Sequence, residues 1–202
     1  PMPTVQWSPQ PGLQLSSEAI AVEQSGAPVT LVRHRLTNTG STPVDGQFVL
    51  LTRPMQVSPP WQNGGLSPIH DIAIEGDDTA PLKGQAVRVN GRVLFHALTA
   101  ADAQGTAPFG THGETEITRY AAEGKVPEQT RTQDESGLAA GMLSYRVQLA
   151  PCAHRDIVLA FALGKDRIDP KAKILPDSPA LDRRVLLGSA RDAGTAFDKL
   201  SV

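Results

Sequence analysis

The sequence predicts a mainly β fold: an antiparallel two-sheet β-sandwich, of the supersandwich or immunoglobulin-like kind, with a short mid-chain helix and a C-terminal amphipathic helix. Glycine and proline, with 18 and 17 residues, occur at intervals along the chain, which is typical of many strands separated by turns. An Asn-Gly pair between alternating apolar residues predicts a tight hairpin. A clean alternation of apolar and polar residues over 142–149 predicts a strand with one buried face.

The first half of the chain contains four β-rich runs. Residues 4–7 (TVQW) and 13–24 (LQLSSEAIAVEQ) form the first two, and the stretch 31–55 contains two more. The last two are joined by NTGSTP (38–43), in which Asn and Gly tolerate a left-handed backbone and Pro blocks further pairing. We therefore expect two antiparallel strands joined by this turn.

Three later segments predict further strands. In AVRVNGRVLFHAL the pair Asn90-Gly91 is flanked by apolar residues, and a type I′ turn requires a positive φ at both central positions. Residues 142–149 alternate between an apolar face and a face expected to meet water, made by Ser144, Arg146 and Gln148. Residues 157–163 (IVLAFAL) are apolar on both faces, so they are expected in the middle of a sheet.

Two segments have helical patterns. Residues 114–127 predict a short helix that stops at Gly124. After a cap at Asp177 or Ser178, apolar residues recur at helical spacing at Leu186, Ala190, Ala193, Phe197 and Leu200. We expect a β-sandwich domain over 1–163, a connecting segment over 164–178, and a C-terminal helix over 179–202 that leads into a further domain.

Charge and cysteine content limit the possible partners. The chain has 19 basic and 21 acidic residues and no Lys/Arg run longer than Arg183-Arg184, so neither nucleic acid nor an anionic membrane is implied. No apolar run approaches the roughly 18 to 20 residues of a membrane span. The single cysteine, Cys152, excludes an internal disulfide and is expected as a small residue in the turn before residue 157.

No motif assigns a metal, a cofactor or a catalytic residue. The five histidines are scattered singly without metal-ligand spacing, and His34 and His96 lie within expected strands. Phosphate-cradling, dinucleotide-binding and Gly-x-Ser-x-Gly motifs do not occur. Acidic residues at 71–78 and 114–116 leave a carboxylate pair or a calcium site open, with a solvated turn as the simpler interpretation.

The long connection RPMQVSPPWQNGGLSPIHDI (53–72) contains the candidate binding residues. A tryptophan held by stiff prolines is a platform for the apolar face of a sugar. The candidate set is Trp61, Gln62, Asn63, His70 and Asp71. The alternative is that Trp61 closes the open end of the sandwich as a plug, with help from Val57 and Leu66, or contacts a neighbouring domain. Because adjacent residues in an extended chain point to opposite faces, we do not expect His70 and Asp71 to pair with each other.

Three strings resemble one family in order and spacing: residues 31–72, then VRVNGR, then GLAAGMLSYRVQLAPCAHRDIVLAF. They are similar to the β-sandwich region of large bacterial coagulation-factor-five/eight-type, or discoidin-domain-containing, proteins that also have a six-hairpin glycosidase-like helical domain. The resemblance spans most of 29–163 and implies a periplasmic or secreted location. It transfers no catalytic residue. The sequence departs from the family pattern at Cys152, where a glycine usually follows the proline.

Three functional hypotheses follow. The first is a non-catalytic accessory domain that packs against a neighbouring helical, glycosidase-like domain of the same protein and helps to shape its cleft through the Trp61 loop. The second is an independent carbohydrate-binding module that uses Trp61. The third is an enzyme in its own right, a glycosidase or a sugar epimerase, with the alternative that only the parent protein is a glycoside hydrolase.

Overall fold

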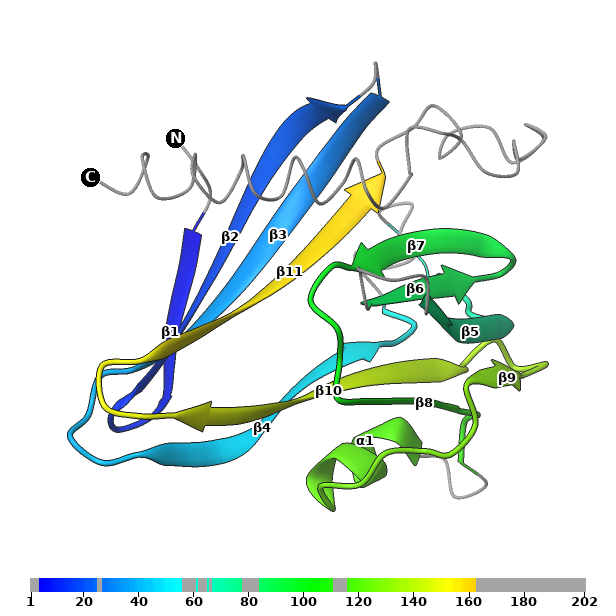
Figure 1. Ribbon diagram of the computed structural model, residues 1–202. Coiled ribbons are helices and arrows are strands. Elements are labelled where there is room, and N and C mark those ends of the chain that lie inside the picture. The colour runs from blue at the N-terminus through cyan, green and yellow to red at the C-terminus, as the bar shows by residue number, and fades with distance from the viewer. Residues whose placement is uncertain are drawn as a thin grey trace.

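The computed structural model of the chain describes residues 4–24, 27–55, 61, 65, 67–77, 84–110 and 116–162, and it confirms the mainly β fold. Its strands form an eight-stranded and a three-stranded sheet (Figure 1), and all strand pairs are antiparallel. In the larger sheet the order is β1 (Thr4–Gln10), β2 (Leu13–Gln24), β3 (Ala27–Asn38), β11 (His154–Ala162), β7 (Arg92–Ala97), β6 (Gly84–Val89), β5 (Asp71–Asp77) and β9 (Arg131–Gln133). The smaller sheet is β4 (Val44–Thr52), β10 (Ala140–Leu149) and β8 (Ala103–Ala107).

The main core lies between the two sheets. Alternate residues of β10 face the larger sheet and are at most 4% exposed: Leu143, Tyr145, Val147 and Leu149. They pack with side chains from the strands of the larger sheet, among them Ile72, Val87 and Ile157. The period-two pattern therefore predicted the buried face of this strand correctly.

Only part of the opposite face of β10 is exposed to water. This corrects the expectation that Ser144 is exposed. Helix α1 (Glu116–Ala122) lies on the outer side of the three-stranded sheet (Figure 1), where Ile117 packs with Ala140 and Met142. Ser144 is 2% exposed and its hydroxyl accepts a hydrogen bond from Gln47 Nε2. Only Arg146 and Gln148 are exposed as expected, because the helix is too short to reach them.

Two other local predictions are confirmed. Asn90 and Gly91 have φ of 50° and 78°, as a type I′ turn between β6 and β7 requires. Strand β11 lies between β3 and β7, well inside the larger sheet. The mid-chain helix is also present, shorter than the 114–127 expected, and the chain leaves it through Gly124 with a φ of 66°.

The expected pairing of the two strands within 31–55 is wrong. Both strands form, but β3 belongs to the larger sheet and β4 to the smaller one, so the turn at 38–43 carries the chain between sheets. The turn between β10 and β11 makes the return crossing at the same end, since the backbone N–H of Cys152 donates to the carbonyl oxygen of Asn38. Both strands find their partners in other segments, which a local turn signal does not reveal.

Asn38 joins these crossings through its side chain, which is fully buried. Its Nδ2 donates to the carbonyl oxygens of Thr42, at 2.8 Å, and Leu149, at 3.0 Å. Its Oδ1 accepts from the backbone N–H of Gly40 at 2.9 Å. One side chain therefore satisfies polar groups of both crossings at once.

Cys152 is exposed and has a φ of 62°, a conformation that favours glycine. A left-handed backbone conformation costs a residue with a Cβ about 1–2 kcal/mol, and glycine avoids this cost. Glycine also increases the conformational entropy of the unfolded chain, which offsets part of the gain in stability. Cys152→Gly is therefore expected to raise the free energy of unfolding by about 0.5 kcal/mol. Urea denaturation measures this. Cys152→Ala keeps the Cβ and should match the wild type, so equal stability of both variants would contradict the prediction.

His34 makes stability depend on pH. Its Nδ1 lies 2.8 Å from Ser17 Oγ, its ring is 5.7 Å from that of Phe48, and burial lowers its pKa below the ordinary 6.5. The unfolded chain therefore binds a proton at His34 more readily than the folded chain does. The free energy of unfolding should fall as the pH drops through 6.5. Denaturation measured between about pH 7.5 and 5.5 should show a smaller decrease in the free energy of unfolding for His34→Phe than for the wild type. An identical loss in both would exclude His34 as its source.

The predicted connecting segment (164–178) and C-terminal helix (179–202) lie outside the described residues. Within the described part of the chain, no helix has the length and apolar character needed to cross a membrane.

Candidate functional site

Trp61 is open to solvent. Its side chain is 83% exposed, so it does not close the end of the sandwich and the plug interpretation is wrong for this side chain. The exposure is compatible with a stacking platform, as the binding hypothesis requires. Gln62 and Asn63, expected as its polar partners, lie outside the described residues, as do Val57 and Leu66.

His70 and Asp71, the other candidate binding residues, lie where the chain enters β5. His70 Nδ1 is 3.2 Å from the carbonyl oxygen of Asp134. The carboxylate of Asp71 instead accepts from Arg131 Nε, at 3.0 Å, and from Nη2, at 3.2 Å. The two residues thus have different partners, in agreement with the alternation of an extended chain.

The side chain of Asn90 holds the backbone at the start of β5. Its Oδ1 accepts from the backbone N–H groups of His70 and Asp71, and its Nδ2 donates to the carbonyl oxygen of Pro68 at 2.8 Å. Sequence reasoning gave Asn90 only a role in the hairpin turn. In the structure its side chain also fixes the end of the long connection.

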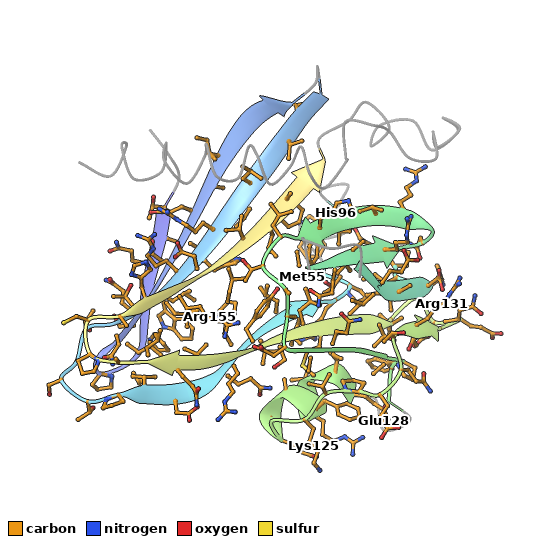
Figure 2. The ribbon with its side chains drawn as sticks, in the orientation of Figure 1. Met55, His96, Lys125, Glu128, Arg131 and Arg155 are labelled. Carbon is orange, nitrogen blue, oxygen red and sulfur yellow. The ribbon has the colours of Figure 1, made fainter. Side chains whose placement is uncertain are left out.

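The ion pair between Asp71 and Arg131 connects the predicted residues to a pocket. The pocket has a volume of about 740 Å³ and lies between β8, α1 and the segment that runs from Lys125 into β9. Figure 2 shows Lys125 near the end of α1, Arg131 on β9, and Glu128 between them. Of the predicted binding residues that the structure describes, Trp61, His70 and Asp71 do not line this pocket.

The inner wall of the pocket is tightly packed. A Cβ at Gly105 would lie 2.1 Å from the carbonyl oxygen of Pro127, so this glycine allows the two backbones to touch. Next to it, the backbone N–H of Thr106 donates to the carbonyl oxygen of Gln129 at 2.6 Å. The hydroxyls of Thr106 and Thr132 are 2.8 Å apart, and both residues are buried. The backbone that forms the pocket is therefore fixed before any ligand arrives.

The positive charges of the pocket already have acidic partners. Lys125 Nζ lies 2.8 Å from Glu123, and its hydrogen bond lowers the pKa of that carboxyl group. Arg131 is held by Asp71 through two hydrogen bonds. Water screens the fully exposed Lys125–Glu123 pair, whereas Asp71 in the second pair is only partly exposed.

Several other polar side chains of the pocket, most of them exposed, have no hydrogen-bond partner among the described residues. The carboxylate of Glu128, the side-chain amides of Gln129 and Gln133, and the hydroxyl of Tyr120 line the pocket and make no hydrogen bond to a described residue. The aromatic ring of Tyr120 packs partly into the cluster formed by Ile117 and Met142. Sequence reasoning did not single out these residues, because the only signal was a polar run after a short helix.

Apolar side chains are exposed at a second place, on strand β1. Val5 is 69% and Trp7 62% exposed, and the two lie on the same face of the strand by period two. Their partners in register on β2 are Ser17 and Leu15. Leu15 packs against the core, so Val5 and Trp7 continue the inner face of the larger sheet beyond the cover of the smaller one.

No metal centre is formed by the described residues, since no three of their His, Cys, Asp or Glu side chains gather closely enough to hold an ion. Comparison with known proteins adds no family: no family model matches the chain, and no curated protein matches it significantly.

Proposed function

We propose that this chain is a non-catalytic accessory β-sandwich domain of a larger bacterial carbohydrate-active, glycosidase-like protein, and that it supports a neighbouring helical domain. The observation that carries this proposal is the exposed pair Val5 and Trp7 on β1. The proposed kind of parent protein is supported by the resemblance of residues 29–163 to the β-sandwich region of large bacterial discoidin-domain-containing proteins.

The pair has the properties of a packing surface. β1 is the outermost strand of the larger sheet and has no charged residue between Thr4 and Gln10. Pro9 and the irregular pairing between Trp7 and Gln10 interrupt only the end of this edge, and the edge at Val5 has no such protection. Burying a large apolar side chain contributes about 1.5–3 kcal/mol. A neighbouring domain that covers Val5 and Trp7 is stabilised by the burial of both side chains, and it also covers the edge of β1.

Hydrogen exchange tests the accessory role. The chain alone is compared with the same chain inside the product of its complete open reading frame. Amides of β1 should exchange more slowly in the full-length protein, and the double variant Val5→Ser, Trp7→Ser should lose this protection. Unchanged exchange of β1, or an open reading frame without a further folded domain, would refute the proposal.

A second candidate function is carbohydrate binding at Trp61, favoured by the 83% exposure of its side chain. Exposed aromatic rings bind sugar faces with favourable stacking. Titration with neutral oligosaccharides should then give binding that Trp61→Ala abolishes. Trp7→Ala is the matched control, because it removes the other tryptophan of the chain, which is also exposed, and it should leave the affinity unchanged.

A further inference from the structure

We propose that the pocket between β8, α1 and the segment 125–133 is a binding site for a neutral oligosaccharide. Its volume of about 740 Å³ falls within the roughly 300–1,000 Å³ typical of small-molecule sites. The site is separate in its residues from Trp61, and its ligand is selected by the groups described above. The proposal does not depend on the accessory role of β1.

The charges of the pocket indicate a ligand without net charge. The lining contains two acidic residues, Glu116 and Glu128, and two basic ones, Lys125 and Arg131. The basic groups are held by Glu123 and Asp71. An anionic ligand would have to break these pairs and would also approach Glu128, whose carboxylate is unpaired among the described residues. The arrangement therefore disfavours phosphate and acidic sugars.

The unpaired groups match the hydroxyls of a sugar. A sugar hydroxyl both donates and accepts, and the side-chain amides of Gln129 and Gln133 do the same, while the carboxylate of Glu128 accepts. Tyr120 adds a hydroxyl and an aromatic ring to the same lining. Convergent amides, a carboxylate and an aromatic residue provide polar orientation together with apolar contact, which polyhydroxylated rings require.

The fixed backbone of the pocket lowers the cost of binding. The contact of Gly105 with Pro127 and the bond from Thr106 to Gln129 hold the wall in one arrangement. The exposed side chains of Glu128, Gln129 and Gln133 would lose freedom when a ligand binds. Their ordering costs about 0.5–1.5 kcal/mol each, so the expected affinity is modest, about millimolar to micromolar.

The experiment is a titration of the full chain, by calorimetry or NMR, with cellopentaose, xylopentaose, mannopentaose and maltopentaose. At least one should bind, with little dependence on salt. Glu128→Ala and Gln133→Ala should each weaken that binding by about tenfold or more. Glu135→Ala is the matched control for charge, because Glu135 is exposed, unpaired among the described residues and absent from the lining. Thermal unfolding shows that each variant is folded.

The possible outcomes separate this site from the other candidates. Binding lost in Glu128→Ala and Gln133→Ala but kept in Trp61→Ala and Glu135→Ala supports the pocket. Binding lost only in Trp61→Ala would overturn the pocket and support the second candidate function. Binding of none of the four sugars, or tighter and salt-sensitive binding of oligogalacturonate, would also overturn it. None of these results bears on the exchange of β1, which tests the accessory role separately.

Discussion

Replacing Asn38 with alanine is expected to lower the free energy of unfolding by about 3 kcal/mol, because each buried polar group that loses its partner costs about 1–3 kcal/mol. The variant removes three hydrogen bonds and leaves the carbonyl oxygens of Thr42 and Leu149 without their donor. For a domain of this size the midpoint of thermal unfolding should fall by roughly 10 °C. Calorimetry or urea denaturation measures the change.

Asn38→Asp separates hydrogen bonding from shape. It keeps the size of the side chain and the acceptor for Gly40, but it replaces the Nδ2 donor with an oxygen that faces two carbonyl oxygens. The variant should be at least as unstable as Asn38→Ala at neutral pH. Thr39→Ala, at the exposed next position, is the control and should change stability by less than about 0.5 kcal/mol. Similar stability of wild type and Asn38→Asp would contradict the role assigned to the Nδ2 donor.

Gly105→Ala is expected to destabilise the protein by about 2–4 kcal/mol and to disturb the pocket, because forced overpacking usually costs 1–3 kcal/mol and here the obstacle is backbone. The new Cβ would lie 2.1 Å from the carbonyl oxygen and 2.9 Å from the Cβ of Pro127. The segment from Pro127 to Gln129 must then move away from β8. Denaturation measures the loss of stability, and oligosaccharide titration should show weaker binding.

Gly46→Ala is the matched control for this substitution. Gly46 also lies within a strand of the smaller sheet, and a Cβ there would meet nothing within 4 Å. Removing a glycine at such a site reduces the entropy of the unfolded chain and should stabilise by about 0.4–1 kcal/mol. The two alanine variants are therefore expected to change stability in opposite directions. A destabilisation of less than about 1 kcal/mol in Gly105→Ala would show that Pro127 yields easily.

The local features of the fold could be predicted because each depends on neighbours in sequence. The alternation around Tyr145 marks the buried face of β10, and Asn90-Gly91 encodes its own turn. The candidate site was predicted less well. His70 and Asp71, which were predicted, do not line the pocket, and its lining residues Glu128 and Gln133 were not predicted, because they become neighbours of Tyr120 only when β9 joins the edge of the larger sheet.

By itself, the sequence determined many of the strands and turns and the short helix, since side-chain period and backbone preference act over a few residues. It did not single out β5, β8 or β9. Only the tertiary structure decided which sheet each strand joins. The turn at 38–43 was predicted to join paired strands, and it joins two sheets instead, because β4 pairs with β10 and β3 with β2 and β11. These partners are distant in sequence, and their choice depends on the joint burial of both sheets, which no single segment specifies. The pocket has the same origin, as its walls come from β8, α1 and β9.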